Sequence, residues 1–542
     1  LYLSKERFVD AAETFDTFVA REPYHPNSPD LAMRSLAVYQ QARFADLVLE
    51  RKRDFVVNYG LESEYWAYHD PEEREDVVGA LKANLIELAE YDHSQAQLND
   101  DPAAYARAAD SYRRYIAYFP EDPESAERSF LLGEVLMETQ QYSEANDAYL
   151  RAAYEYPNYA NAGDSGYAAL LASQAHYQTL EAEVAEAWLA QQLRQAVQFV
   201  QTFPEHEQTP LVLTNTAETY YASAEQDEAL VVAGQLLMFE EPASAELRRV
   251  SWTVVGHGHF DLGHYARAEI AYLELRSMGD AGRVTNAEGL GALTAVEIDE
   301  RIAASIYRQA EGAQMAGSVD IAVMHYLRVE KVTPNASIAA QSTYDGSVLL
   351  FNEERYIESI EVMTGFRVTY PEHPVYANDI TRNLAVAYQR SDQPLLAAVE
   401  YEAVAAFSIE TPEIRREALY TAAELYEEGE DINSGRRVWR QVVAEYPQPI
   451  GENIELQQHL ADLASQMDDI ADRHFWLGEI ITTDAGAGEQ RTVRTKTLAA
   501  RATFELTEVK RAAFMSVTLT IPLEQSITGK KALMEEALEG YN

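Results

Sequence analysis

The 542-residue sequence contains no cysteine, and this absence removes several kinds of chemistry at once. Disulfides, cysteine-ligated zinc, iron–sulfur clusters and cysteine nucleophiles are all excluded. Avoidance of cysteine suits an oxidising compartment such as a periplasm. No run of about 18 apolar residues occurs, so the sequence predicts no transmembrane helix. No signal peptide is recognisable after the first residue, Leu1.

Basic residues are also scarce. The chain has 43 of them, only 8 being lysine, against 89 acidic residues, which gives a net charge of −46. Nucleic acid is a poor partner for such a surface, because its binding depends on neutralising phosphates. Two interpretations remain: an acidic groove for a basic partner, or a surface adapted to high salt, where screening reduces self-repulsion. The even spread of acidic residues along the chain favours the second.

If the acidity is an adaptation to salt, thermal stability should keep rising as salt is added well beyond about 0.5 M. At such concentrations the dissolved ions screen the repulsion between charges that lie more than a few ångströms apart. Thermal melts at increasing salt concentration measure this effect. A midpoint that stays flat or falls would reject salt adaptation and leave the acidic groove.

Catalytic and ligand-binding motifs are missing. There is no phosphate loop, no HExxH, no GxSxG and no EF-hand loop. Histidines gather only in GHGHFDLGH, which contains His257, His259 and His264. Imidazoles bind metals, but His257 and His259 are two residues apart on a predicted helix and so point to nearly opposite sides. We therefore expect no enzyme activity, no cofactor and no metal site.

Apolar residues at helical spacing fill most of the chain. Residues 126–159 predict two short amphipathic helices joined by a tight turn. Gly133 is small where the two helices approach each other, and Pro157 ends the second helix. The second helix carries one apolar stripe, formed by Tyr142, Ala145, Tyr149 and Ala152. Such a pair cannot bury its apolar face alone, so it must stack on copies of itself.

This spacing resembles the tetratricopeptide (TPR) repeat, whose pattern is W-x2-L-G-x2-Y, later A-x3-F and then P. A second copy spans residues 249–282, where Trp252 and Gly256 occupy the first slots, His259 replaces the tyrosine and Asp280 stands in the proline slot. The resemblance implies an all-α fold, a right-handed α-solenoid (superhelix) of stacked TPR-type helix–turn–helix repeats.

The remaining sequence repeats the same organisation. Further pairs are expected at residues 28–60, 209–241, 303–336, 340–373, 378–411 and 416–449. Residues 165–204 are looser and are expected to hold longer helices, ending at Phe203-Pro204. A weaker pair at 452–483 is expected to use Ala471 and Phe475 in its apolar stripe. A long helix is expected from about Pro71 to Leu98.

The pattern divides the chain into three parts. An N-terminal solenoid spans 1–282, and the solenoid continues over 283–483 after a break near 279–286. A flexible break at 484–488 then precedes a basic helical segment and the start of a further repeat within 484–542. Because the chain begins with half a repeat and ends in an unfinished one, we expect both termini to be truncated.

In TPR proteins the first helix of each repeat lines the concave face, where ligands usually lie as extended peptides or helices. Carried over to this chain, the second, fifth, ninth, twelfth and thirteenth positions of each unit face the ligand. The candidate binding residues are Glu127, Phe130, Glu134, Met137, Thr253, His257, Phe260, Arg382, Gln389, Tyr420, Glu424 and Glu427. The lysine and asparagine of the chaperone-binding TPR clamp are absent from these slots. A mixed acidic and aromatic face suits a basic or amphipathic protein or peptide partner.

The resemblance thus implies a non-enzymatic scaffold for protein–protein interaction. Strings such as YFPEDP and TYPEHP, which end second helices in aromatic–proline, also resemble bacterial cell-envelope TPR proteins of the BamD type and the TolA-binding type. That implies membership of an envelope complex and a periplasmic or outer-membrane-associated location, with the cytoplasm as the alternative. The alternative function is the scaffold part of a larger enzyme or transport machine whose activity lies outside this sequence.

One basic cluster stands out in the acidic chain, at residues 491–511. It contains Arg491, Arg494, Lys496, Arg501, Lys510 and Arg511. Such a cluster could contact an acidic partner, lipid headgroups or another acidic part of the same chain, and a simple solvated helix face is as good an interpretation.

Overall fold

A computed structural model describes residues 2–239, 241–283 and 289–541. These residues contain 25 α-helices, five short 3-10 helices and no β-strand, which confirms the predicted all-α fold. By their contacts they form two compact units. Unit 1 extends to Leu262 and includes Asp280–Leu293, and unit 2 comprises Gly263–Gly279 and the residues from Thr294 onward.

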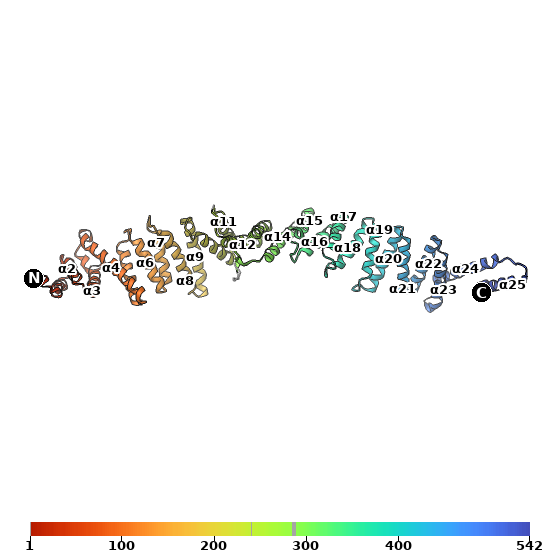
Figure 1. The fold of residues 1–542 in the computed structure, drawn as a ribbon, viewed down its shortest axis with the longest axis horizontal. Coiled ribbons are helices and arrows are strands. Elements are labelled where there is room, and N and C mark those ends of the chain that lie inside the picture. Colours follow the sequence, from red (N-terminus) through yellow and green to blue (C-terminus); the bar gives the residue numbers. More distant parts are fainter. Residues whose placement is uncertain (1, 240, 284–288, 542) are drawn as a thin grey trace. The chain divides into compact units, whose positions relative to one another are not determined.

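The helices of each unit follow one another in chain order (Figure 1). Unit 1 contains η1 (Leu3–Lys5), α1 (Phe8–Arg21), α2 (Ser28–Gln41), α3 (Ala45–Tyr59), η2 (Glu64–Ala67), η3 (Pro71–Glu73), α4 (Glu75–Asn99), α5 (Pro102–Tyr118), α6 (Ser125–Glu138), α7 (Tyr142–Tyr154), α8 (Ala162–Tyr177), α9 (Ala182–Thr202), α10 (Thr209–Ala222), α11 (Gln226–Leu237), α12 (Ala245–Asp261) and η4 (Leu290–Ala292). Unit 2 contains α13 (Tyr265–Ser277), α14 (Ala295–Met315), α15 (Val319–Val332), α16 (Ala339–Asn352), α17 (Tyr356–Thr369), α18 (Ala377–Arg390), α19 (Pro394–Ala405), α20 (Pro412–Glu428), α21 (Ile432–Glu445), α22 (Ile450–Gln466), α23 (Ile470–Gly486), η5 (Gly488–Gln490), α24 (Val493–Ser516) and α25 (Leu523–Tyr541).

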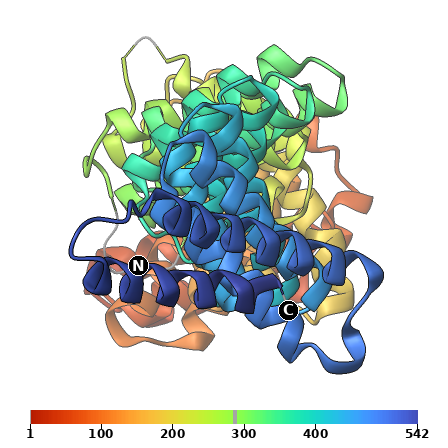
Figure 2. The ribbon, with the colours of Figure 1, turned by 90° about the vertical axis from the view of Figure 1, so that its right-hand side faces the viewer.

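Within each unit, every helix packs against the next one along the chain. The last two helices, α24 and α25, lie side by side (Figure 2). The even-numbered helices are the first helices of their pairs, and the odd-numbered helices are the second. First helices of successive pairs also contact each other, as α2 and α4 or α10 and α12 do in unit 1, and α16 and α18 or α22 and α24 in unit 2. This stacking is what the repeated apolar stripes require.

The ends of the second helices follow from their aromatic–proline strings. Helices α5 and α9 each end one residue before an aromatic that precedes proline, Phe119 and Phe203 respectively. The residue before proline is pushed out of the helical region, so each helix stops there. A buried hydroxyl on the next helix then donates to the carbonyl of that aromatic: Ser125 Oγ to Phe119 at 2.6 Å, and Thr209 Oγ1 to Phe203 at 2.7 Å. Each hydroxyl therefore fixes the start of the following first helix.

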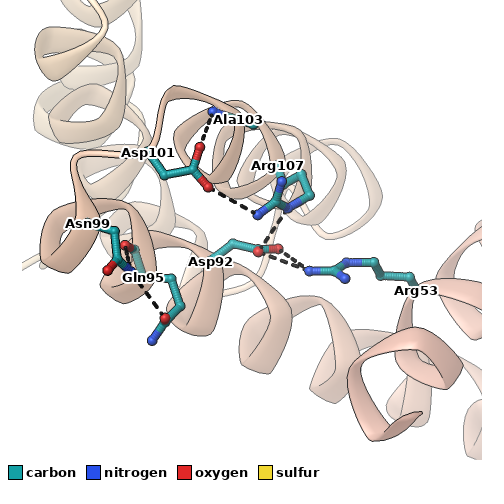
Figure 3. Close-up of polar contacts among 7 residues, drawn as sticks. All are labelled: Arg53, Asp92, Gln95, Asn99, Asp101, Ala103 and Arg107. Carbon is teal, nitrogen blue, oxygen red and sulfur yellow. Dashed lines mark hydrogen bonds and ion pairs between the residues drawn. The ribbon is translucent and has the colours of Figure 1, made fainter. Parts of the chain in front are cut away.

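A buried carboxylate joins three helices of unit 1. Asp92 of α4 is 1% exposed. Its carboxylate accepts hydrogen bonds from Arg53 of α3, at 3.0 and 3.2 Å, and from Arg107 of α5, at 3.0 Å (Figure 3). Arg107 also lies 3.9 Å from Asp101, which caps α5 by accepting from the backbone N–H of Ala103. The two arginines thus hold both neighbouring helices to α4.

We expect Asp92→Asn to lower the free energy of unfolding of unit 1 by about 1–3 kcal/mol. This is less than for a fully buried pair, because both guanidinium groups are half-exposed and water can solvate them. Urea unfolding and hydrogen exchange of α3–α5 measure the change. Asp110→Asn, which removes an exposed partner of Arg114, is the matched control and should change stability by less than about 0.5 kcal/mol. Equal losses for the two variants would show that the buried carboxylate does not join the helices.

The structure differs from the sequence-based expectations in several places. Residues 484–486 of the expected break at 484–488 are helical, because α23 continues to Gly486, where Asp484 is buried and accepts a hydrogen bond from Arg491. In the same helix Ala471 and Phe475 are exposed, and Trp476 is buried in their place. The long helix expected from Pro71 begins at Glu75, after the 3-10 helix η3.

The boundaries expected between parts of the solenoid stay predictions. The break near residues 279–286 overlaps residues 284–288, which lie outside the described residues. The pair expected at 249–282 forms its two helices, α12 and α13, and the division between the two units falls between them.

Candidate protein-binding face

The first helices of successive pairs form one surface in each unit, which we name the first-helix face. The candidate residues of α6 all lie at least partly exposed on this helix: Glu127, Phe130, Glu134 and Met137. Glu127 accepts a hydrogen bond from the hydroxyl of Tyr159 at 2.7 Å. Glu134 accepts one from the hydroxyl of Tyr149, a buried residue of α7. Both carboxylates are therefore already engaged within the chain.

In α18, the candidate residues are engaged in a similar way. Arg382 forms ion pairs with Asp379 and Glu410, and its guanidinium lies 6.0 Å from the centre of the Phe407 ring. Gln389 accepts a hydrogen bond from the hydroxyl of Tyr401 at 2.8 Å. Arg382 is thus neutralised by two carboxylates of its own unit.

The first-helix face of unit 2 carries an aromatic and charged cluster around Trp439 of α21. The ring of Tyr420 meets Trp439 edge to face, with centroids 4.8 Å apart. The indole N–H of Trp439 donates to Glu427, and His459 Nε2 lies 2.8 Å from the same carboxylate oxygen. Burial raises the pKa of Tyr420 from its ordinary value. The structure thus brings together the candidate residues Tyr420 and Glu427, while the candidate Glu424 is exposed on the same helix.

Helix α12 gives a different result for its candidates. Thr253 is fully buried, and its hydroxyl donates to the carbonyl of Arg249 at 2.9 Å, so the expectation that Thr253 faces a ligand is wrong. His257 and Phe260 are partly exposed, and the His257 ring lies 5.9 Å from that of Tyr221. Across the described ranges, no group of three or more histidine, aspartate or glutamate side chains is arranged to hold a metal ion.

One internal contact recurs in unit 2. An acceptor in the last turn of a first helix takes a hydrogen bond from an aromatic side chain twelve residues later, on the second helix. The three examples are Gln314 with Tyr326, Gln389 with Tyr401, and Glu427 with Trp439. In unit 1, Glu134 plays the same part toward Tyr149 from one turn earlier. The ninth and twelfth positions therefore serve the repeat itself as well as the surface.

A groove of about 470 Å³ opens on the first-helix face of unit 1, between α8 and α10, with α9 beside them. Its apolar lining includes the leucines 170 and 171 of α8 and 189 and 193 of α9. The polar lining is formed by Gln174, Gln192, Asn215, Thr216, Glu218 and Thr219, together with Tyr167. The groove thus combines leucines from α8 and α9 with polar side chains from all three helices.

Two acceptors in this groove have no donor. Glu218 is partly buried and forms no hydrogen bond or ion pair with a described residue, and burial raises its pKa. Gln192 donates to Gln174 through its amide nitrogen, while its Oε1 atom is buried without a partner. A buried acceptor without a donor, such as Gln192 Oε1, is uncommon in folded proteins, because it destabilises the fold.

An alignment of α10 with α6 explains why Glu218 lacks a hydrogen-bond partner. Both helices begin at the buried hydroxyl residue described above, Ser125 or Thr209, so Glu218 corresponds to Glu134. The residue corresponding to the donor Tyr149 is Ala233, which has no hydroxyl. The repeat therefore keeps the acceptor and lacks the donor.

We expect Glu218→Gln to raise the melting temperature at pH 7. Because the pKa of Glu218 is raised in the folded chain, its charged form disfavours the folded state at every pH above that raised pKa. The gain should shrink as the pH falls and vanish below about pH 4, where the carboxyl is protonated in both states. Paired thermal melts across this range measure it, with Glu186→Gln on the exposed side of α9 as control. A lower melting temperature for Glu218→Gln at pH 7 would mean that the carboxylate has a stabilising partner.

A second groove, which we name the outer groove, lies on the other side of α9. It has a volume of about 320 Å³ and lies between the second helices α9 and α11, against α10. Its lining includes Val197, Val200, Leu213, Val231 and Val232, with Asp227 and Glu228. Because it lies between second helices, it does not belong to the first-helix face.

The basic cluster at residues 491–511 is largely neutralised by carboxylates of its own unit. The ion pairs are Arg491 with Asp484, Arg494 with Glu455, Arg501 with Glu505, and Arg511 with Glu508. Asp484 and Glu455 belong to another acidic part of the chain, one of the interpretations left open by the sequence, whereas Glu505 and Glu508 lie on the same helix as the cluster.

Comparison with known proteins finds the repeat in two places. Residues 129–159 and 417–449 match the family model described as tetratricopeptide repeat. They correspond to the pairs α6/α7 and α20/α21. A search of curated proteins found no match. No helix in the described part of the chain combines the length and apolar character needed to cross a bilayer.

Two solved structures are similar at low identity. The crystal structure of the P58(IPK) TPR domain is 16% identical, with a TM-score of 0.21, and the match covers 66% of this chain and 99% of that one. The APC/C hetero-tetramer Cut9–Hcn1 is 10% identical, with a TM-score of 0.18, and the match covers 92% and 94%. Such low TM-scores carry no inference about function. The family match and the stacked helix pairs together establish that this all-α solenoid contains tetratricopeptide repeats.

Proposed function

We propose that this chain is a non-enzymatic scaffold that binds segments of partner proteins on its first-helix face. The observation that carries the proposal is the groove between α8 and α10, which combines partly exposed leucines with two acceptors for which no described residue supplies a donor. Grooves with an apolar lining and a few polar groups are typical of binding sites. Tetratricopeptide repeats are a common framework for protein–protein interaction, which agrees with this role.

The partner segment is basic or amphipathic. The first-helix face offers carboxylates and aromatic rings, as in the cluster of Tyr420, Glu427 and Trp439. The cationic candidate Arg382 is already paired with Asp379 and Glu410. A net charge of −46 also attracts basic partners over long range and repels nucleic acid.

Capture from native cells tests the scaffold role. The protein is crosslinked in its own cells at their own salt concentration, partners are identified by mass spectrometry, and each is purified and titrated against the chain. We expect at least one partner that binds directly and has a basic or amphipathic segment. If no captured protein binds the purified chain, the scaffold proposal is wrong.

We also propose that the scaffold acts in a bacterial envelope complex, in the periplasm or at the outer membrane. Two observations support this location: the aromatic–proline ends of several second helices, which resemble envelope TPR proteins, and the complete absence of cysteine. Fractionation of native cells, with the chain detected by antibody, tests it. Recovery in the cytoplasmic fraction, with cytosolic enzymes as captured partners, would contradict it and favour the scaffold part of a larger enzyme.

A further inference from the structure

We propose that the groove between α8 and α10 binds a peptide segment in which an arginine or lysine stands between apolar side chains, with the cation placed at Glu218 and Gln192. This inference rests on the proposed scaffold function and names the chemistry of the segment that one groove accepts.

The leucines of α8 and α9 that line the groove require apolar side chains in the bound segment. Leu171 is 50% exposed, and Leu170 and Leu189 are partly exposed beside it. Covering this surface with apolar side chains removes it from water, which favours the complex. A uniformly charged peptide would leave the leucines in water, so charge alone does not fit this groove.

The carboxylate of Glu218 requires a basic residue in the bound segment. Its carboxylate is partly withdrawn from water and has no partner among the described residues, so the free chain already bears part of the desolvation penalty. A guanidinium or ammonium group then supplies a charge-assisted hydrogen bond without a further large penalty on the protein side. In the α6/α7 repeat, the Tyr149 hydroxyl fills this need for Glu134. In the α10/α11 repeat the corresponding residue is Ala233, which has no hydroxyl, so the bound peptide supplies the donor for Glu218.

A second acceptor supports the same chemistry. Gln192 lines the groove, and its Oε1 atom is buried without a donor. Because the amide nitrogen of Gln192 is held by Gln174, the oxygen is fixed as an acceptor. No lysine or arginine lines the groove, so the required donors do not come from the groove itself. Arginine, with five N–H donors, suits a site with several acceptors better than lysine.

Peptide display on the whole chain tests the inference. A random library of peptides about 16 residues long is selected on the immobilised protein, and the enriched peptides are sequenced. We expect them to share an arginine or lysine flanked by leucine, isoleucine or phenylalanine. Enriched peptides without a basic residue, or no enrichment at all, would overturn the inference.

Matched variants then locate the site. We expect Glu218→Gln to weaken the binding of a selected peptide by about 30-fold or more, since removing one partner of a buried charge pair costs about 2 kcal/mol or more. Replacing the arginine of the peptide by neutral citrulline should weaken binding to a similar extent. Glu186→Gln, the same change at an exposed position of α9, should leave affinity within about twofold. Far-UV circular dichroism checks that each variant is folded.

The inference and the scaffold function can fail separately. If Glu218→Gln binds the selected peptides and the captured partner as tightly as the wild type does, the groove assignment is wrong and the scaffold function stands. If no captured partner binds the chain at all, the scaffold function is wrong, whatever the peptides show.

Discussion

Replacing Trp439 by alanine should lower the free energy of unfolding of unit 2 by about 3–5 kcal/mol, the usual loss for a buried tryptophan. Trp439 is 3% exposed and lies between Tyr420 and His459, with ring centroids 4.8 and 5.7 Å away. Its indole N–H also donates to Glu427, and this hydrogen bond is lost with the ring. The variant therefore leaves a cavity beneath the first-helix face and removes one of the two partners of the Glu427 carboxylate, the other being His459.

One further variant separates these contributions, and a second serves as a control. Trp439→Phe keeps an aromatic ring but removes the N–H donor, so it should cost less than the alanine variant. Phe475→Ala removes a ring that is 55% exposed and should change stability by less than about 0.5 kcal/mol. Denaturant unfolding gives the totals, and hydrogen exchange in α20–α22 shows where protection is lost, since repeats can unfold locally. If Phe475→Ala cost as much as Trp439→Ala, the buried core of unit 2 would be misplaced.

Gly133→Ala should destabilise unit 1 by about 1–3 kcal/mol, the typical cost of overpacking a core. A Cβ atom at residue 133 would lie 2.5 Å from Cε1 and 2.6 Å from Cδ1 of Tyr149. The Tyr149 ring is 2% exposed, and its hydroxyl is held by Glu134, so it cannot move aside freely. Helices α6 and α7 would have to separate.

The same substitution elsewhere should have the opposite sign. At Gly365 of α17, an added Cβ meets no atom within 4 Å. Gly365→Ala should therefore raise the free energy of unfolding by about 0.5–1 kcal/mol through helix propensity alone. Paired denaturant unfolding of the two variants compares them. A gain at both positions would show that α6 and α7 do not approach closely at Gly133.

Much of this fold can be predicted from periodicity. The stripe of residues 142, 145, 149 and 152 fixes which side of α7 is covered, and Tyr149 and Ala152 are indeed buried. Where the periodicity is weak, it does not predict which side chains of a helix face the core. In α23 the adjacent aromatics Phe475 and Trp476 both suit an apolar stripe, and only packing against α22 and α24 decides that Trp476 is buried. The buried Asp484 at the end of α23 depends on Arg491, seven residues later, and local glycine content predicts a break there instead.

The candidate site is harder to predict, because the same positions serve two purposes. Position alone places Gln389 and Glu427 toward a ligand, yet each accepts a hydrogen bond from an aromatic of its own repeat. Thr253 is buried although its position predicts exposure. The sequence alone could have identified the groove acceptor Glu218: it aligns with the candidate residue Glu134, and Ala233 stands where the α6/α7 repeat has Tyr149. Periodicity does not predict the groove that α8 and α10 leave between them.

Site-specific photo-crosslinking to a captured partner would test the central claim, that partners bind the first-helix face. A benzophenone amino acid is placed either at Leu171, in the groove between α8 and α10, or at Val231, in the outer groove. Both positions are well exposed, at 50% and 61%, so they react with similar ease. We predict a covalent adduct with the partner from position 171 and little or none from position 231. An adduct formed only from position 231 would contradict the account and assign binding to the second-helix side.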